Sequence, residues 1–199
     1  MPRGVAIPEV RQQLFAAAER VITRDGPSKL SGRAVTSEAG VATGLLHAHF
    51  ADFDEFLAAY AIDRAFLVSA AAAALPERAG TGSVAGNLCD AILSTPPATV
   101  AVLLRLLVAR PELTGRVRTV LGDTTAGLDA IEKAAATYLT AEQQLGRVAA
   151  AVDPAALALA LVGVLHHVVL TAAAQSDVHT RVQQAITALV EAVTTMTRH

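Results

Sequence analysis

The sequence predicts an all-α protein, and three observations support this. Aromatic residues make up only 4% of the 199 residues, while hydrophobic residues make up 53%, with much of the excess being alanine. The β-branched residues recur at helical spacing, three or four positions apart, and do not alternate as in a half-buried strand. Signals that start and stop helices follow one another along the chain. A chain of this length can bury the core of one or two domains.

The first helix is predicted over residues 8–24. Its apolar residues share one stripe at helical spacing: Val10, Leu14, Ala18, Val21 and Ile22. Asp25, Gly26 and Pro27 follow, and glycine followed by proline is typical of a helix end.

Two short helices separated by a tight turn are predicted over residues 30–50. Ser31 can cap the first of them, because its hydroxyl can accept a hydrogen bond from a backbone N–H at the helix start. Gly40 stands where that helix must end in a left-handed conformation, which glycine adopts without a steric penalty. Val41 then points inward, and Leu45 and Leu46 give the second helix a buried side. This is the helix-turn-helix pattern, in which the second helix enters the major groove of DNA.

A fourth helix is predicted from Asp52 to about residue 75. Asp52 can cap it, and Asp54 and Glu55 lie in its first turn, where negative charge is favourable. Phe56, Leu57, Tyr60 and Phe66 continue along the same segment.

A three-helix head joined to a fourth helix and a long helical body resembles the TetR family of transcriptional regulators. The residues that carry the resemblance are the first helix, Gly26, the run G-V-A-T-G-L-L-H-A-H-F from Gly40 to Phe50, and D-E-F-L at residues 54–57. It covers roughly residues 10–60, and over the rest of the chain only helix lengths and size agree. The resemblance implies a helix-turn-helix DNA-binding domain over residues 1–51 and a helical ligand-binding and dimerisation domain over residues 52–199.

The expected DNA contacts lie near the start of the second helix and on the outer face of the third. They are Lys29, Ser31, Arg33, Ala42, Thr43, Gly44 and His47. Thr43 and His47 can hydrogen-bond to bases or phosphates of a double-stranded operator. His47 stands where the family usually has tyrosine, and Phe53 where it usually has lysine. In the family both positions usually touch phosphates.

The charge of the head predicts a modest electrostatic contribution to DNA binding. Residues 1–57 hold six Lys and Arg against seven Asp and Glu, and the whole chain has a net charge of −2. Phosphate neutralisation by Lys and Arg supplies most non-specific affinity for DNA. Few candidates are available for it: Arg3, Lys29, Arg33 and a protonated His47. A helical corner with no DNA partner is the alternative interpretation.

Further helices are predicted over residues 84–93, 98–109, 112–140, 154–175 and 178–197. The last one carries a wide apolar stripe that includes Ile186 and Leu189. Two terminal helices with such faces can pair with their copies as a four-helix bundle, which is how TetR-like proteins usually form homodimers. Packing of these faces onto other helices of the same chain is the alternative.

Residues 155–174 raise the question of a membrane span, because they are apolar except for His166, His167 and Thr171. Asp153 and Pro154 start the segment, and no positive flank marks an inside loop. A helix of a soluble protein, buried on nearly all sides, is the favoured interpretation. A membrane protein is the alternative, and solubility without detergent tests it. The first ten residues lack the apolar core that is typical of a signal peptide, and the single Cys89 fits a reducing cytoplasm, so a cytoplasmic location is expected.

No catalytic constellation, metal site or cofactor motif stands out, so an enzyme is not expected. His166 and His167 are adjacent and point about 100° apart on a helix, so they cannot chelate one metal together. The family resemblance implies a cavity for a small apolar ligand, with Phe66, Leu103, Leu107 and Tyr138 as walls and His166 and His167 as polar contacts. Leu106, Leu165 and Arg105 are further candidates, and all of these positions can equally be core.

The predicted function is a TetR-like transcriptional regulator, a repressor that a small apolar ligand releases from its operator. The alternative is a helical ligand-binding or interaction protein that has lost DNA binding.

Overall fold

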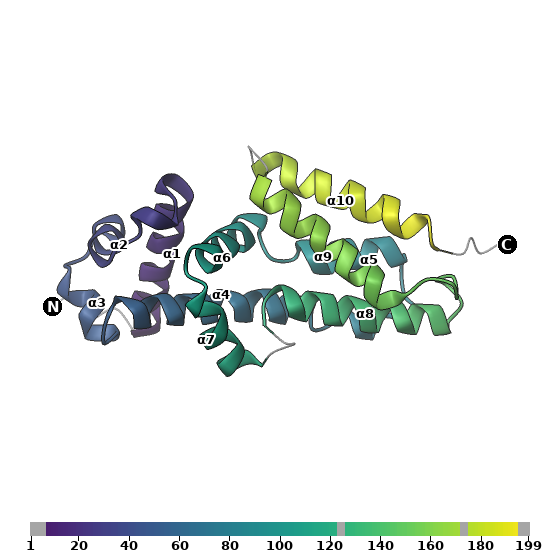
Figure 1. The fold of residues 1–199 in the computed structure, drawn as a ribbon, viewed down its shortest axis with the longest axis horizontal. Helices are drawn as coiled ribbons and strands as arrows, with labels where there is room; N and C mark the ends of the chain where they lie inside the picture. The colour runs from purple at the N-terminus through teal and green to yellow at the C-terminus, as the bar shows by residue number, and fades with distance from the viewer. Residues whose placement is uncertain (1–6, 123–125, 172–174, 195–199) are drawn as a thin grey trace. The chain divides into compact units, whose positions relative to one another are not determined.

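The computed structural model of the protein describes residues 7–122, 126–171 and 175–194. These residues form ten α-helices, two short 3₁₀ turns and one isolated bridge between Val148 and Thr194 (Figure 1). The helices are α1 (Ile7–Asp25), α2 (Gly32–Ala39), α3 (Gly44–His49), α4 (Phe53–Ala72), α5 (Val84–Leu93), α6 (Pro97–Ala109), α7 (Glu112–Leu121), α8 (Leu128–Gln144), α9 (Pro154–Thr171) and α10 (Gln175–Glu191). The predicted all-α fold is confirmed.

The helix starts predicted from capping residues are confirmed at atomic detail. The backbone N–H of Ala34 donates to Ser31 Oγ at 3.2 Å, at the start of α2. The backbone N–H of Glu55 donates to Asp52 Oδ1 at 2.7 Å, at the start of α4. Each bond satisfies one of the donors that a helix start leaves without an internal partner.

One predicted helix is wrong. The single helix expected over residues 112–140 is two helices, α7 and α8, with Gly122 and Gly127 at their junction. Both glycines have positive φ, 90° and 57°, which a right-handed helix cannot accommodate. Helix α10 ends at Glu191 instead of continuing to residue 197, and residues 195–197 lie outside the described part of the chain.

The chain divides into two compact units. The first comprises residues 1–63 and 102–117, and the second comprises residues 64–101 and 118–199. The domain boundary predicted at residue 51 follows the helix-turn-helix, whereas the first unit also includes about three turns of α4. It also includes a segment from the middle of the chain that the sequence did not associate with the head.

Aromatic rings form the core of the first unit. The ring of Phe15 on α1 lies 6.1 Å from that of Phe50, 5.7 Å from Phe56 and 5.6 Å from Tyr60, measured between centroids. All four residues are buried. Such tilted and edge-to-face pairs add to the stabilisation from buried area, so α4 is fixed against the head at its first turns.

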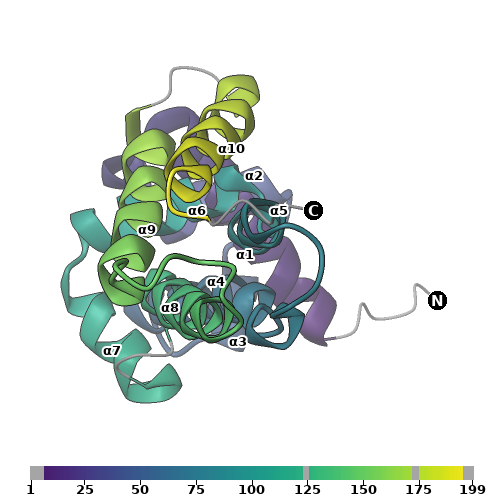
Figure 2. The ribbon, with the colours of Figure 1, turned by 90° about the vertical axis from the view of Figure 1, so that its right-hand side faces the viewer.

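Helices α5, α8, α9 and α10 make up most of the second unit, with α8 packed along α9, and α10 against both α5 and α9 (Figure 2). A buried polar cluster joins two of its loops to this core. Asn87 Nδ2 donates to the hydroxyl of Tyr138 at 3.0 Å and to the carbonyl oxygen of Thr81 at 2.7 Å. The fully buried Glu142 accepts a hydrogen bond from the N–H of Gly80, and Arg147 Nε lies 3.3 Å from its carboxylate.

Helix α9 is not buried on nearly all sides, contrary to the prediction. One face is buried, through Ala158, Leu161, Val162, Leu165, Val168 and Val169, whereas Leu159 is 59% exposed and His166 and His167 are also exposed. The segments Pro154–Thr171 and Phe53–Arg78 are each long and apolar enough to cross a membrane, and the bent pair α5 and α6 would count as a third. Because only part of α9 packs inside the chain, its apolar outer face needs a separate explanation.

Candidate nucleic-acid interface

Local hydrogen bonds fix the turn between α2 and α3. Gly40 has a left-handed backbone with φ of 68°, and its N–H donates to the carbonyl oxygen of Ser37 at 3.1 Å. The N–H of Val41 reaches back to the carbonyl oxygen of Thr36 at 3.0 Å. These bonds satisfy the last carbonyl groups of α2 in the manner of a glycine C-cap. The predicted role of Gly40 is therefore confirmed, and it sets the direction of α3.

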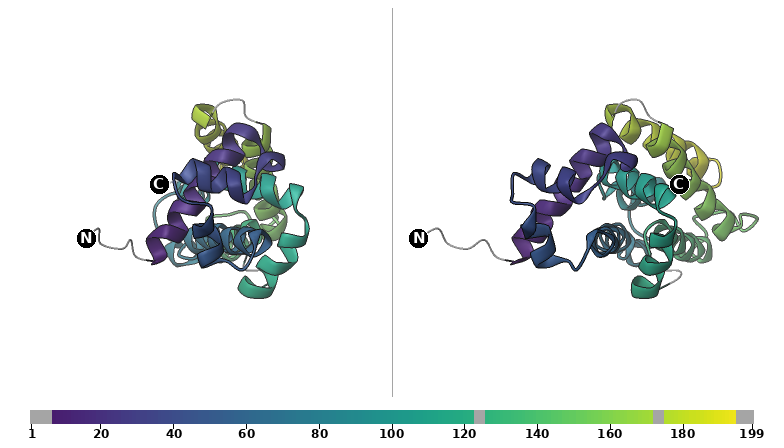
Figure 3. Two further views of the ribbon diagram at one scale, coloured as in Figure 1. Left: turned by 90° about the vertical axis from the view of Figure 1, so that its left-hand side faces the viewer. Right: turned by 60° about the vertical axis from the view of Figure 1, so that its left-hand side comes forward.

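Helix α3 has one buried side and one exposed side. Leu46 is 1% exposed, and Phe50 just beyond the helix is 3% exposed. Gly44, His47 and Ala48 are all exposed, and their spacing of three and four places them on the face opposite Leu46. Helix α1 packs along α2, which completes the three-helix head (Figure 3). The head thus presents a short helix with a polar and small-residue outer face.

All the predicted DNA-contact residues are exposed, on a surface formed by the start of α2, the turn and α3. They are Lys29, Ser31, Arg33, Ala42, Thr43, Gly44 and His47. Thr43 makes no capping hydrogen bond with its side chain, so its hydroxyl is not used to start α3. Ser37 is exposed as well, one turn after Arg33 on α2. Sequence analysis missed Ser37, although its spacing from Arg33 places both on one face.

Part of the positive charge of the head is neutralised internally. Arg20 Nε lies 2.7 Å from Glu38 Oε1, and an Arg24 guanidinium nitrogen lies 2.8 Å from Glu38 Oε2. Arg24 also pairs with Asp25 at 2.8 Å. Hydrogen bonds from Arg20 and Arg24 hold the pKa of Glu38 below its usual value, and the hydrogen bond from Arg24 lowers the pKa of Asp25. These two arginines therefore join α1 to α2 and have less charge to offer to phosphates.

The other cationic residues of the head are Arg11, Lys29, Arg33 and Arg3. Arg11 lies with its guanidinium carbon 4.6 Å from the centre of the Phe50 ring, a cation–π contact over the aromatic core. Lys29 and Arg33 are exposed near the start of α2. Arg3, the other predicted phosphate contact, lies outside the described residues.

Phe53 is a packing residue at the start of α4. Its ring is stacked on that of Phe56, with centroids 5.7 Å apart and an interplanar angle of 18°. A Cβ added at Gly32 would lie 3.7 Å from Phe53 Cδ2, so the start of α4 lies against the start of α2. An aromatic ring here adds apolar contact where a lysine would add charge. His49 is half-buried beside the buried Phe50.

The residues predicted to line a ligand cavity are divided between the two compact units. Leu103 and Leu107 belong to the first unit, while Phe66, Tyr138, His166 and His167 belong to the second. Phe66 is 57% exposed and both histidines are exposed, whereas Tyr138 is fully buried. Burial and a hydrogen bond with Glu142 raise the pKa of Tyr138 to about 12, which fits a core residue.

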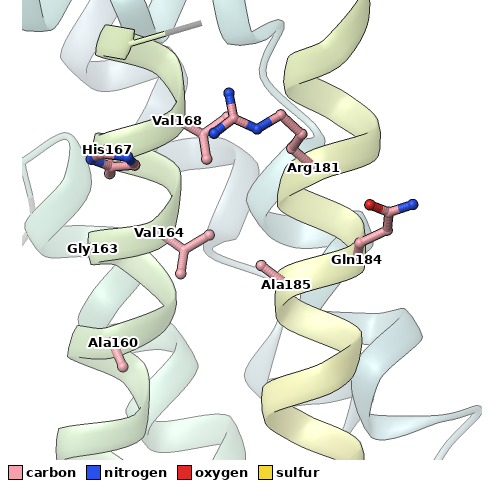
Figure 4. Close-up of a pocket in the computed structure, with 8 residues that line it drawn as sticks. All are labelled: Ala160, Gly163, Val164, His167, Val168, Arg181, Gln184 and Ala185. Atoms are coloured by element: carbon pink, nitrogen blue, oxygen red, sulfur yellow. The ribbon is translucent and has the colours of Figure 1, made fainter.

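An open groove lies between α9 and α10, with a volume of about 730 Å³. Val164 of α9 and Ala185 of α10 face each other across it, and Arg181 extends from α10 toward Val168 (Figure 4). Ala160, Gly163, His167 and Gln184 complete its lining. Of the predicted ligand contacts, His167 alone is among these residues. The described residues contain no group of three His, Cys, Asp or Glu side chains that could hold a metal ion.

Comparison with known proteins agrees with this geometry. A sequence profile described as "Bacterial regulatory proteins, tetR family" matches residues 14–60. A search of curated proteins gives no match.

Many solved structures share the fold. A transcriptional regulator from Saccharomonospora viridis, in complex with choline, aligns with a TM-score of 0.71 at 17% identity, over 95% of this chain and 100% of its own. A TetR transcription regulator from Haloarcula marismortui aligns with a TM-score of 0.68 at 16% identity, over 95% and 100%. A TetR-family regulator from Rhodococcus aligns with a TM-score of 0.62 at 21% identity, over 92% and 100%. The head of the chain therefore carries the sequence pattern of the tetR family of bacterial regulatory proteins, and the chain shares the fold of these regulators along nearly its whole length.

Proposed function

We propose that the protein is a homodimeric transcriptional repressor that binds operator DNA through α3 and is released by a small apolar ligand. The observation that carries this proposal is the outer face of α3. Gly44, His47 and Ala48 lie exposed on it, opposite the buried Leu46, in a head fixed by caps and aromatic packing. A helix held in this way can enter the major groove with its backbone close to the base edges.

The two kinds of DNA contact come from different parts of this surface. Thr43 and His47 can hydrogen-bond to base edges or phosphates, and the small residues Ala42 and Gly44 let the backbone approach closely. Lys29 and Arg33 supply charge for phosphates, and Ser31 holds the start of α2, where backbone N–H groups also favour an anion. Sequence preference thus depends on α3 and its turn, and general affinity on the start of α2.

Dimerisation accounts for the exposed face of α9 and α10. Leu159 is 59% exposed and Leu189 is 37% exposed, and the groove between the two helices has an apolar lining. Ala160 and Gly163 have side chains small enough for another helix to come close. Ile186, which the sequence placed on the pairing face, is fully buried within the protomer, so Leu159 and Leu189 are better probes. A two-fold pairing of these helices would join two heads in one molecule, as an operator with two half-sites about 34 Å apart requires.

Ligand release requires a coupling between the body and the heads. Helix α4 is continuous from Phe53 to Ala72, with its first part in one unit and its remainder in the other. A ligand that favours a different setting of α4 would change the spacing of the heads and lower DNA affinity. The choline complex of the regulator from Saccharomonospora viridis supports small-molecule binding in proteins of this fold.

A second candidate function is a ligand-binding or interaction protein without DNA affinity. The observations that favour it are the packing of Phe53 on Phe56 and the neutralisation of Arg20 and Arg24 by Glu38. Both reduce the charge available to phosphates.

Fluorescence anisotropy with duplexes from upstream of the gene and of its neighbours separates the two candidates. We expect one duplex to bind, and the double variant Thr43→Ala/His47→Ala to bind it at least tenfold more weakly, since a good base contact is worth about 1–3 kcal/mol. Thr23→Ala is the matched control, because Thr23 is exposed on α1 outside the proposed surface. If no duplex binds even at low salt, the second candidate replaces the first. If binding is unchanged in the double variant, the contact surface lies elsewhere.

A further inference from the structure

Two arginines from the middle of the chain lie beside the first turn of α4. An Arg116 guanidinium nitrogen is 3.5 Å from the carbonyl oxygen of Asp54, and one of Arg110 is 3.8 Å from the Asp54 carboxylate. Arg116 lies on α7 and Arg110 in the link between α6 and α7. These residues all belong to the first unit, so their relative placement is part of one compact body.

The first turn of α4 adjoins the proposed DNA-binding surface. Phe53 Cδ2 and Leu46 Cδ1 lie 3.7 Å and 3.8 Å from the position of a Cβ built at Gly32. The starts of α2 and α4 and the inner side of α3 therefore meet at this point. Arg33 on α2 is next to Gly32, and Arg116 is beside Asp54, which follows Phe53.

The two arginines differ in whether nearby carboxylates neutralise their positive charge. Arg110 lies between two carboxylates, 3.8 Å from that of Asp54 and 3.6 Å from that of Glu112. Arg116 is exposed, and within the described part of the chain its only contact is to a neutral carbonyl oxygen. A guanidinium has five N–H donors, so most of those on Arg116 are not used by this contact.

The acidic residues around this turn are already engaged. Asp52 Oδ1 accepts a hydrogen bond from the N–H of Glu55, and the Glu55 carboxylate accepts one from the N–H of Ala51. The carboxylate of Asp54 faces Arg110. These three side chains therefore have partners of their own, and among the described residues no carboxylate neutralises Arg116.

We propose that Arg116 contacts a phosphate of the DNA backbone beside the first turn of α4. Phe53 stands at the first position of α4, where the family usually has lysine, and it carries no charge. Arg116 on α7 would supply a positive charge in its place. The proposal rests on the proposed DNA-binding function. It adds a residue far from the helix-turn-helix in sequence to the DNA-binding surface.

The salt dependence of DNA binding tests the proposal. Each neutralised phosphate contributes about 0.9 to the slope of log affinity against log salt concentration. Arg116→Gln should therefore lower the slope by about 2 in a dimer, and weaken binding to the operator and to an unrelated duplex by the same factor. Arg116→Lys, which keeps the charge, should retain most of the slope.

Arg118→Gln is the matched control. Arg118 is exposed two residues further along the same helix, and the substitution removes the same charge. However, Arg118 pairs with Asp129 at 3.3 Å, so its charge is already neutralised. We expect its slope and affinity to equal those of the wild type. Thermal unfolding of each variant verifies that the fold is intact.

Two outcomes would overturn the proposal while leaving the proposed function standing. One is that the wild type binds DNA and Arg116→Gln binds it with the same slope of log affinity against log salt concentration. The other is an equal loss of slope in Arg116→Gln and Arg118→Gln, which would indicate a general effect of net charge. A wild type that binds no duplex would overturn the proposed function and, with it, this contact.

Discussion

The two compact units of the protein are stabilised by different kinds of side chain. Of the seven aromatic residues, five lie in the first unit: Phe15, Phe50, Phe53, Phe56 and Tyr60. Each of their rings is within 6.1 Å of another, centroid to centroid. In the second unit, Phe66 is exposed and Tyr138 is part of a polar cluster, so the remaining core is aliphatic.

This difference matches what each unit is proposed to do. Large rings that contact one another admit few alternative packings, and so they hold α3 in one orientation. Alanine, glycine and valine on the outer face of α9 and α10 leave a shallow surface that a second copy can approach closely. The head therefore depends on precise internal packing, and the body on a surface that remains open in the protomer.

The largest expected effect tests the aromatic core. Phe15→Ala should destabilise the first unit by about 3–5 kcal/mol, because the residue is 2% exposed and contacts three other rings. Phe66→Ala is the control with the same chemical change at an exposed position, and it should change stability by less than about 1 kcal/mol. Thermal unfolding followed by circular dichroism measures both. Equal losses of stability in Phe15→Ala and Phe66→Ala would mean that the aromatic contacts of Phe15 do not stabilise the first unit.

The next largest effect is on the oligomeric state, and it concerns the exposed face of α9 and α10. Leu159→Glu should convert a dimer into a monomer, since pairing would bury an unpaired charge at a cost of several kcal/mol. The protomer should keep its stability, because Leu159 is exposed within it. Sedimentation velocity at micromolar concentration gives the oligomeric state, with Thr137→Glu on α8 as the control. A wild type that is monomeric would contradict the dimer directly.

A smaller effect concerns the polar cluster of the second unit. The pKa of Tyr138 is raised to about 12, so the folded state holds this proton more tightly than the unfolded state does. Its contribution to stability is therefore complete below about pH 10 and is lost as the pH rises from about 10 through 12. Tyr138→Phe should cost about 1 kcal/mol at neutral pH and should lessen the decline in alkali. Urea denaturation midpoints between pH 8 and about pH 11 compare the two proteins, and an identical pH dependence would refute the assignment.

The smallest effect on stability concerns Glu38, which is at the surface. The pKa of Glu38 is lowered, so the stability that it contributes is present above its ordinary pKa and is lost as the pH falls through the lowered value. Glu38→Gln should reduce this acid dependence slightly and should release Arg20 and Arg24. The salt slope of DNA binding should then steepen, by up to about 0.9 for each phosphate that these arginines newly reach. Glu77→Gln is the matched control, because Glu77 is exposed in the second unit and its substitution removes the same charge.

The sequence predicted the features that depend on a few neighbouring residues. Ser31, Gly40 and Asp52 specify where helices start and stop, because capping hydrogen bonds and positive φ angles involve residues within one turn. The helix-turn-helix and its exposed face follow from the same local signals. The break between α7 and α8 also has a local cause, the positive φ angles of Gly122 and Gly127, although a single helix was predicted there.

Tertiary structure alone decided which faces are buried and which distant segments meet. It buries Ile186 and exposes Leu159, although both are apolar residues on helices with broad apolar faces. It places residues 102–117 in the first unit, and brings Arg116 to Asp54 across 62 positions of the chain. Helical periodicity says which residues share a face but not what that face packs against, because packing partners are chosen by shape and area over the whole chain.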